Sequence, residues 1–242
     1  MGLIDKVYVK EVNKYIEVLY EDNHIIVCTK PEGVLSQKDI TNDIDMLTII
    51  KQYLKEKYNK PGDVYLGLVH RLDRRVEGVM VFAKTSKAAS RLSENIREHK
   101  FYKEYVAICS GYFENSGRLV NSLSKEKGKA LESETGKEAI LEYNVINHFQ
   151  LNKDDFTVIR IILHTGKYNQ IRKQMQLFGH SLINDFKYGY RLSNYNDSLG
   201  LRCVAIGFTH PTTKEYLEFR RSKSETYTNV SWKKYMEEWY EQ

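Results

Sequence analysis

The sequence predicts an α+β fold with a mixed, largely antiparallel β-sheet flanked by helices. Three observations support this class. Short runs of β-branched and apolar residues recur along the 242 residues, short turns join them, and the helical segments do not alternate regularly with the strands. A doubly wound parallel fold is disfavoured, because the sequence contains no glycine-rich loop with dinucleotide or P-loop spacing.

The first part of the chain is expected to open with a hairpin, in which Glu21-Asp22-Asn23 forms the turn. Leu47, Ile50 and Leu54 then repeat at helical spacing after Asp45, a residue suited to the helix N-cap, and Ser86 can cap a second helix. The expected elements are the hairpin over residues 16–30, helices over 46–58 and 87–99, and strands over 79–82 and 101–108.

The second part is expected to contain a polar connection, two strands, a helix and a last hairpin. Residues 113–137 are rich in Ser, Lys, Glu and Gly and show little apolar periodicity, which predicts an exposed connection with at most a short strand. Gly179 suits the left-handed position after a helix. The expected elements are strands over 139–146 and 156–163, a helix along Ile171, Met175 and Phe178, a hairpin over 201–209 and 215–219, and a helix over 231–242.

Composition limits the classes of function. A net charge of +5 and a pI near 8.8 permit a polyanionic partner without establishing one. The odd number of cysteines, Cys28, Cys109 and Cys203, and their wide spacing predict buried core thiols in a reducing compartment. No histidine pair has metal-ligand spacing, and neither a signal segment nor a membrane-length apolar stretch is present, so we expect a cytoplasmic protein without metal or membrane association.

One charged cluster lies between an apolar segment and a strand. Arg71, Arg74 and Arg75 surround Asp73, after Leu66-Gly67-Leu68-Val69 and before the strand over residues 79–82. One interpretation is a structural ion pair at a strand end. The other is an ionised nucleophile in a basic pocket, because neighbouring cations keep a carboxylate charged.

Several strings in the same order resemble one known family. The string HRLDRRVEGVMVFAKTS, over residues 70–86, resembles the central motif of the RluA family of pseudouridine synthases. The strings LYEDNHIIVCTKPEGV, KEYVAICSG, TGKYNQIRKQMQLFGHSLINDFKYG and LRCVAIGFTHPTTKEYLEF resemble its other motifs. The resemblance runs from about Leu19 to Phe219, and several strings in order are more specific than one short motif.

The resemblance implies a pseudouridine synthase fold that binds RNA and uses no metal or organic cofactor. By the matching positions, Asp73 is the nucleophile, Tyr105 lies under the uracil and Arg172 pairs with Asp73. Arg71 takes the place of the target uridine in the RNA helix, and Ile171 lines the pocket. A single carboxylate is enough, because the reaction only moves the uracil from N1 to C5 on the same sugar.

The expected partner is ribosomal or transfer RNA, bound by a monomer. We expect Arg74 and Lys84, with Arg75, to contact phosphates around the cleft. Residues 1–15 are predicted to be an N-terminal extension and residues 16–242 one catalytic domain. The residues before the first motif are too few for the S4 RNA-binding domain of many relatives.

The chain departs from the family pattern beside two motifs, which bears on the substrate rather than on the reaction. The differing residues are Arg75, Val76 and Glu77 after the central motif, Lys167 and Asn169 before Gln170, and Ser181 and Asn184 further on. Two other functions remain open: an RNA-binding or ribosome-assembly protein without turnover, and a small-molecule glycosidase or nucleosidase. The latter would usually need a second carboxylate.

Overall fold

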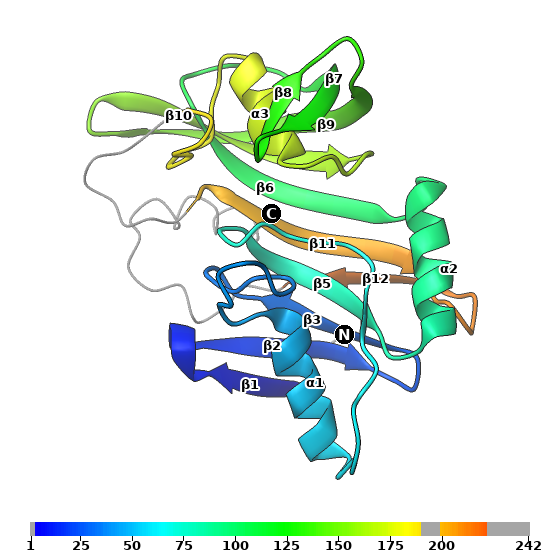
Figure 1. Ribbon diagram of the computed structural model, residues 1–242. Coiled ribbons are helices and arrows are strands. Elements are labelled where there is room, and N and C mark those ends of the chain that lie inside the picture. The colour runs from blue at the N-terminus through cyan, green and yellow to red at the C-terminus, as the bar shows by residue number, and fades with distance from the viewer. Residues whose placement is uncertain (1–2, 190–198, 222–242) are drawn as a thin grey trace. The chain divides into compact units, whose positions relative to one another are not determined.

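The computed structural model describes residues 3–189 and 199–221 (Figure 1). These residues fold as two compact units. The first unit contains residues 3–102 and 203–221, and the second contains residues 103–189 and 199–202. The described residues contain three α-helices and form strands whose pairs are largely antiparallel, so the predicted α+β class is confirmed.

The first unit is built on a sheet with the strand order β1-β2-β3-β5-β11, in which β12 also pairs with β11 and β4 with β5. Its strands are β1 (Asp5–Val9), β2 (Lys14–Glu21), β3 (Ile25–Lys30), β4 (Gly67–Leu68), β5 (Glu77–Ala83), β11 (Leu201–Thr209) and β12 (Tyr216–Arg220). Its helices are the 3-10 helix η1 (Lys10–Val12), α1 (Met46–Lys57) and α2 (Ser86–Arg97). The predicted hairpins, helices and central strand are all present.

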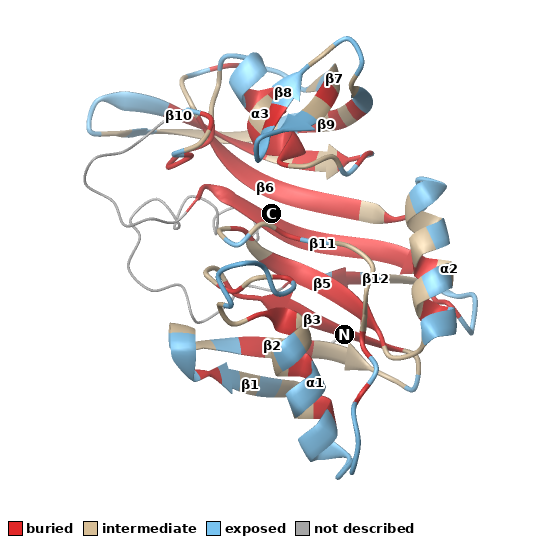
Figure 2. Cartoon of the chain, viewed as in Figure 1, coloured by how far each residue is buried: buried red, intermediate tan, exposed pale blue. Residues whose placement is uncertain are grey.

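The middle strands of this sheet form the core of the first unit (Figure 2). All six residues of β3 are buried, and six of the seven in β5 are buried. Helix α1 contributes Met46, Ile50 and Leu54 to the core, and Asp45 caps it as predicted, because its carboxylate accepts a hydrogen bond from Thr48 N at 3.2 Å. Helix α2 begins one residue earlier than predicted, with Thr85 as its cap.

The segment expected as an N-terminal extension contributes a strand to the same sheet. Strand β1 pairs antiparallel with β2, with Val7 opposite Ile16 and Asp5 opposite Val18. Val9 is 2% exposed, so the segment also adds to the core. The described part of residues 1–15 therefore belongs to the first unit.

The second unit has the strand order β6-β10-β9-β7-β8, and all of its neighbouring strands pair antiparallel. Its elements are β6 (Tyr102–Ser110), β7 (Gly117–Glu126), β8 (Lys129–Glu132), β9 (Lys137–Leu151), β10 (Asp154–Leu163) and α3 (Gln170–Leu177). Helix α3 packs near β7 and β8. It ends at Leu177, and Gly179, the predicted stop, lies two residues further on, with a left-handed φ of +91° and an N–H that donates to Gln176 O.

The prediction for residues 113–137 was wrong. The segment contains the β7–β8 hairpin, and β7 pairs with β9 from Gly117 to Leu123. Only Leu123 of β7 and Ala130 of β8 are buried, so the strands carry too few apolar residues for a clear alternating pattern. Their pairing comes from the tertiary position of β9 rather than from local sequence. The predicted helix over residues 231–242 lies outside the described residues.

Candidate functional site

Asp73 lies in the loop that joins β4 to β5 in the first unit. Two buried apolar side chains, Leu72 and Val76, fix the loop on either side of it. Ser36 adds two hydrogen bonds, because its hydroxyl donates to Leu72 O at 2.7 Å and accepts from Leu72 N at 3.1 Å. A further bond from Val76 N to Asp73 O closes the turn at 2.9 Å. The loop therefore has a fixed backbone, while Asp73 itself is only half-buried.

A buried lysine binds backbone carbonyl groups in and beside the loop. The Lys30 ammonium is fully buried and donates to the carbonyl oxygens of Val34, Pro31 and Arg74, at 2.7, 3.1 and 3.2 Å. Burial lowers the pKa of Lys30 from 10.5 to about 7, although nearby acids, including Asp73, oppose the shift. Lys30 thus connects the end of β3 to the backbone just after Asp73.

The start of β5 packs closely against β11. Gly78 has a φ of +146°, and a Cβ at this position would collide with backbone and side-chain atoms of Cys203. His70, before the loop, accepts a hydrogen bond from Val81 N at 3.1 Å. Both ends of the Asp73 loop are therefore attached to β5.

The cations beside Asp73 differ in their surroundings. Arg71 is exposed and therefore accessible to a ligand from solvent. Arg74 is about half-exposed, but it forms an ion pair with Asp43 at 2.6 Å and donates from Nε to Gly33 O at 3.1 Å. Arg74 thereby fastens the loop to residues 33–43, and its predicted contact with RNA stays a prediction.

Lys84 is largely buried and forms an ion pair within the first unit. Its side chain is 11% exposed, and its ammonium donates to Glu21 Oε1 and to Asp22 O, both at 2.6 Å. Burial alone would raise the pKa of Glu21, but hydrogen bonds from Lys84, Lys57 and Tyr58 hold it below the ordinary value. The ion pair favours a role in joining β2 to β5, and the predicted RNA contact of Lys84 stays a prediction.

The predicted residues of the second unit lie on β6 and α3. Tyr105 is 6% exposed in the middle of β6, opposite Ile161 of β10. Ile171 and Arg172 lie in the first turn of α3 and are 4% and 7% exposed. Since Asp73 and these three residues belong to different units, their predicted meeting stays a prediction.

Glutamine side chains hold α3 in place. Gln174 donates from Nε2 to Ala139 O and Leu119 O, at 3.0 and 3.2 Å. Gln170 accepts hydrogen bonds from Lys167 N and the Thr165 hydroxyl, at 2.9 and 2.8 Å. Both amides are buried, so the helix that carries Ile171 and Arg172 is tied to β7, β9 and the preceding turn.

The structure assigns Arg172 a partner that the sequence did not indicate. Asp185 accepts hydrogen bonds from Arg172 Nε at 2.8 Å and from its terminal nitrogen at 2.7 Å, in a two-point pair. Asp185 is fully buried, and its Oδ1 also accepts from the backbone N–H groups of Lys187 and Tyr188 at 3.0 and 3.1 Å. Because 13 residues separate the pair, no local pattern predicts it; an acid after the α3 motif was the only available signal.

The other predicted features concern metals, thiols and membranes. Cys28, Cys109 and Cys203 are buried thiols, and burial raises the pKa of Cys28 and Cys109. Residues 3–189 and 199–221 contain no group of three or more His, Cys, Asp or Glu side chains placed to hold a metal ion. Within the same ranges, none of the helices has the length and apolarity needed to span a membrane.

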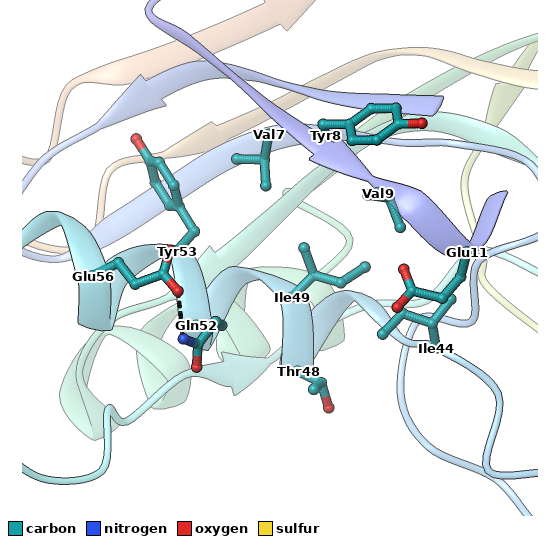
Figure 3. A pocket seen from close by; sticks show the side chains of 10 residues that line it. All are labelled: Val7, Tyr8, Val9, Glu11, Ile44, Thr48, Ile49, Gln52, Tyr53 and Glu56. Carbon is teal, nitrogen blue, oxygen red and sulfur yellow. Dashed lines mark hydrogen bonds between the residues drawn. The ribbon is translucent and has the colours of Figure 1, made fainter. Parts of the chain in front are cut away.

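A pocket lies apart from the predicted residues, between β1 and α1 (Figure 3). Its volume is about 350 Å³, and its lining combines apolar side chains such as Val7 and Ile49 with Glu11 and Glu56. None of the residues predicted for the site lines it. This pocket is therefore not the predicted site.

Comparisons with known proteins agree with the motifs. A family model described as RNA pseudouridylate synthase matches residues 24–177, which is more than half of the chain. An uncharacterized RNA pseudouridine synthase of Aquifex aeolicus is 29% identical over 93% of this chain and 75% of its own length. Ribosomal large subunit pseudouridine synthase D of Yersinia pestis is 33% identical over 73% of this chain, which matches 53% of that protein.

Solved structures show the same fold. Human RNA Pseudouridylate Synthase Domain Containing 1 superposes with a TM-score of 0.69 over 86% of this chain and 83% of its own, at 18% identity. Human RNA Pseudouridylate Synthase Domain Containing 4 superposes with a TM-score of 0.65 over 86% of this chain and 88% of its own, at 20% identity. These likenesses show that the chain has the fold of those two proteins.

Proposed function

Because this chain belongs to the RNA pseudouridylate synthase family, of the RluA type, and is thus an isomerase, we propose that it converts a specific uridine of ribosomal RNA to pseudouridine with Asp73 as nucleophile. The choice of ribosomal RNA rests on relatives named ribosomal large subunit pseudouridine synthase D. The single observation that carries the proposed role of Asp73 is the fixed loop that presents it.

The loop geometry suits a nucleophile. A carboxylate that acts on the ribose must hold its position without being sealed from the substrate. Leu72, Val76, Ser36 and Lys30 fix the backbone around Asp73, yet the side chain keeps partial access to solvent. The reaction needs no second acid to complete the isomerisation.

The other predicted residues take the remaining tasks. A base stacked in an RNA helix must be extruded before reaction, at a cost of a few kcal/mol that an inserted side chain can offset. The exposed Arg71 has the length and charge for this task. Tyr105 and Ile171, both buried, supply walls that keep water from the sugar while the uracil is detached.

Arg172 is the proposed orienting cation. Its bidentate pair with Asp185 fixes the guanidinium plane at the start of α3. The pair uses Nε and one terminal nitrogen, and a guanidinium carries five N–H donors in all. One guanidinium can bind two carboxylates, and the family resemblance implies Asp73 as a second carboxylate for Arg172.

The proposal is tested by mapping pseudouridines in total RNA from cells with and without this protein. Loss of one position in large-subunit ribosomal RNA is the expected result. Loss of a position in transfer RNA would move the substrate to that class. An unchanged map, together with RNA binding, would favour the alternative of an RNA-binding protein without turnover.

A further inference from the structure

A row of alternating cations and aromatic rings leads away from Arg172 in the second unit. The guanidinium carbon of Arg172 lies 5.3 Å from the ring centre of Tyr188, and Lys187 Nζ lies 5.7 Å from the same ring. Lys187 Nζ is also 4.9 Å from the ring centre of Tyr168, and Lys125 Nζ is 4.6 Å from it. We call these five residues the cation–aromatic row.

The row runs from the interior to the surface. Arg172 and Tyr188 are buried, Lys187 and Tyr168 are half-buried, and Lys125 is exposed. Its members come from α3, from the segment after Asp185, from the turn before α3 and from β7. The outer end is therefore accessible to a ligand, and the inner end is the proposed orienting cation.

Hydrogen bonds fix the row before any ligand arrives. The Tyr188 hydroxyl accepts from Ala130 N at 2.6 Å and from Asn169 Nδ2 at 3.1 Å. Lys187 donates from Nζ to the Tyr168 hydroxyl at 3.1 Å. Preorganised side chains lose less conformational entropy when a ligand binds, so the row suits recognition as well as structure.

The charges favour an anionic ligand. Two ammonium groups, those of Lys125 and Lys187, lie within 5 Å of the centre of the Tyr168 ring. In the described part of the chain, Lys125 forms no ion pair with a carboxylate. A phosphodiester carries the negative charge and the oxygen acceptors that lysine ammonium groups bind in nucleic acids.

We propose that Lys125 and Lys187 bind backbone phosphates of nucleotides that flank the target uridine, with Tyr168 holding the two ammonium groups in place. The inference rests on the proposed function, because it takes the partner to be RNA. Tyr168 lies between Lys167 and Asn169, two positions at which this chain departs from the family pattern. The row can therefore contribute to substrate choice in this particular protein.

The test measures RNA binding against salt for Lys125→Gln, Lys187→Gln and the double variant, with a labelled oligouridylate as probe. A plot of log affinity against log salt loses about 0.7 to 0.9 of slope for each phosphate contact removed. The slope for the double variant should therefore be smaller by about 1.4 to 1.8. In single-turnover assays on a large-subunit ribosomal RNA transcript, half-saturation should rise about 2- to 5-fold per lysine, more than the maximal rate falls.

The matched control is Lys51→Gln, which removes the same charge from an exposed position on α1. It should leave the salt slope within about 0.3 of the wild-type value. An unchanged slope in the double variant, with normal folding by circular dichroism, would show that the row only fastens β7 to the segment after Asp185. If the wild-type protein forms pseudouridine in the single-turnover assay, an unchanged salt slope counts against the row alone and not against the proposed function.

Discussion

The buried pair of Arg172 and Asp185 predicts a large effect for Asp185→Asn. The substitution keeps the size of the side chain and one oxygen that can accept the two backbone N–H groups, but it removes the charge opposite Arg172. Arg172 would remain a buried cation without this partner. Removing one member of a buried pair costs about 3 to 5 kcal/mol.

Retention of the backbone hydrogen bonds places Asp185→Asn at the lower end of that range, about 3 kcal/mol. For a chain of this size, 1 kcal/mol shifts the melting temperature by about 2 to 4 °C, so Tm should fall by about 6 to 12 °C. Displacement of Arg172 should also slow single-turnover isomerisation by about 10-fold or more. Thermal unfolding followed by circular dichroism measures the first effect, and quenched reactions on RNA measure the second.

A double-mutant cycle separates the pair from general loss of packing. With Arg172→Gln as the second change, Asp185→Asn should cost less than it does alone, and the coupling should be about 1 kcal/mol or more. Additive effects, or a melting temperature within about 2 °C of the wild-type value for Asp185→Asn, would refute the reasoning.

Three further predictions concern Lys30, Gly78 and Tyr105. Burial lowers the pKa of Lys30 to about 7 against 10.5 in the unfolded chain, so its contribution to the free energy of unfolding is present above 10.5 and is lost as the pH falls through about 7. In urea unfolding between pH 6.5 and 9, the free energy of unfolding should rise with pH in the wild type but not in Lys30→Met. Parallel curves of that free energy against pH for the two proteins would contradict the prediction. Gly78→Ala should destabilise by about 2 to 4 kcal/mol, since its Cβ meets Cys203, and a loss below about 0.5 kcal/mol in urea would argue against that contact. Tyr105→Phe should bind RNA normally but turn over about 100-fold more slowly if the hydroxyl transfers a proton, and a wild-type single-turnover rate would leave the ring only a packing role.

Much of the fold follows from local sequence. The strand over residues 201–209 and the helix after Asp45 have the predicted type and nearly the predicted bounds, because apolar periodicity and capping act over a few residues. The β7–β8 hairpin was missed because its strands are mostly polar and depend on β9 for pairing. Local patterns do not report such distant support.

Part of the candidate site also follows from local sequence, and part depends on contacts between distant residues. A continuous motif is enough to predict the Asp73 loop, and the structure supplies the reasons for its rigidity in Ser36 and Lys30. The partners of Lys84 and Arg172 are Glu21 and Asp185, 63 and 13 residues away. Charged residues are so common in the sequence that only the fold selects which acid meets which cation.

The most direct test of the account compares wild-type protein and Asp73→Asn on a large-subunit ribosomal RNA transcript under single-turnover conditions. The wild type should form pseudouridine at one position. Asp73→Asn should form none, while its RNA affinity stays within about tenfold, or about 1.4 kcal/mol, of the wild-type value. Pseudouridine formation by Asp73→Asn would contradict the assignment of Asp73 as nucleophile.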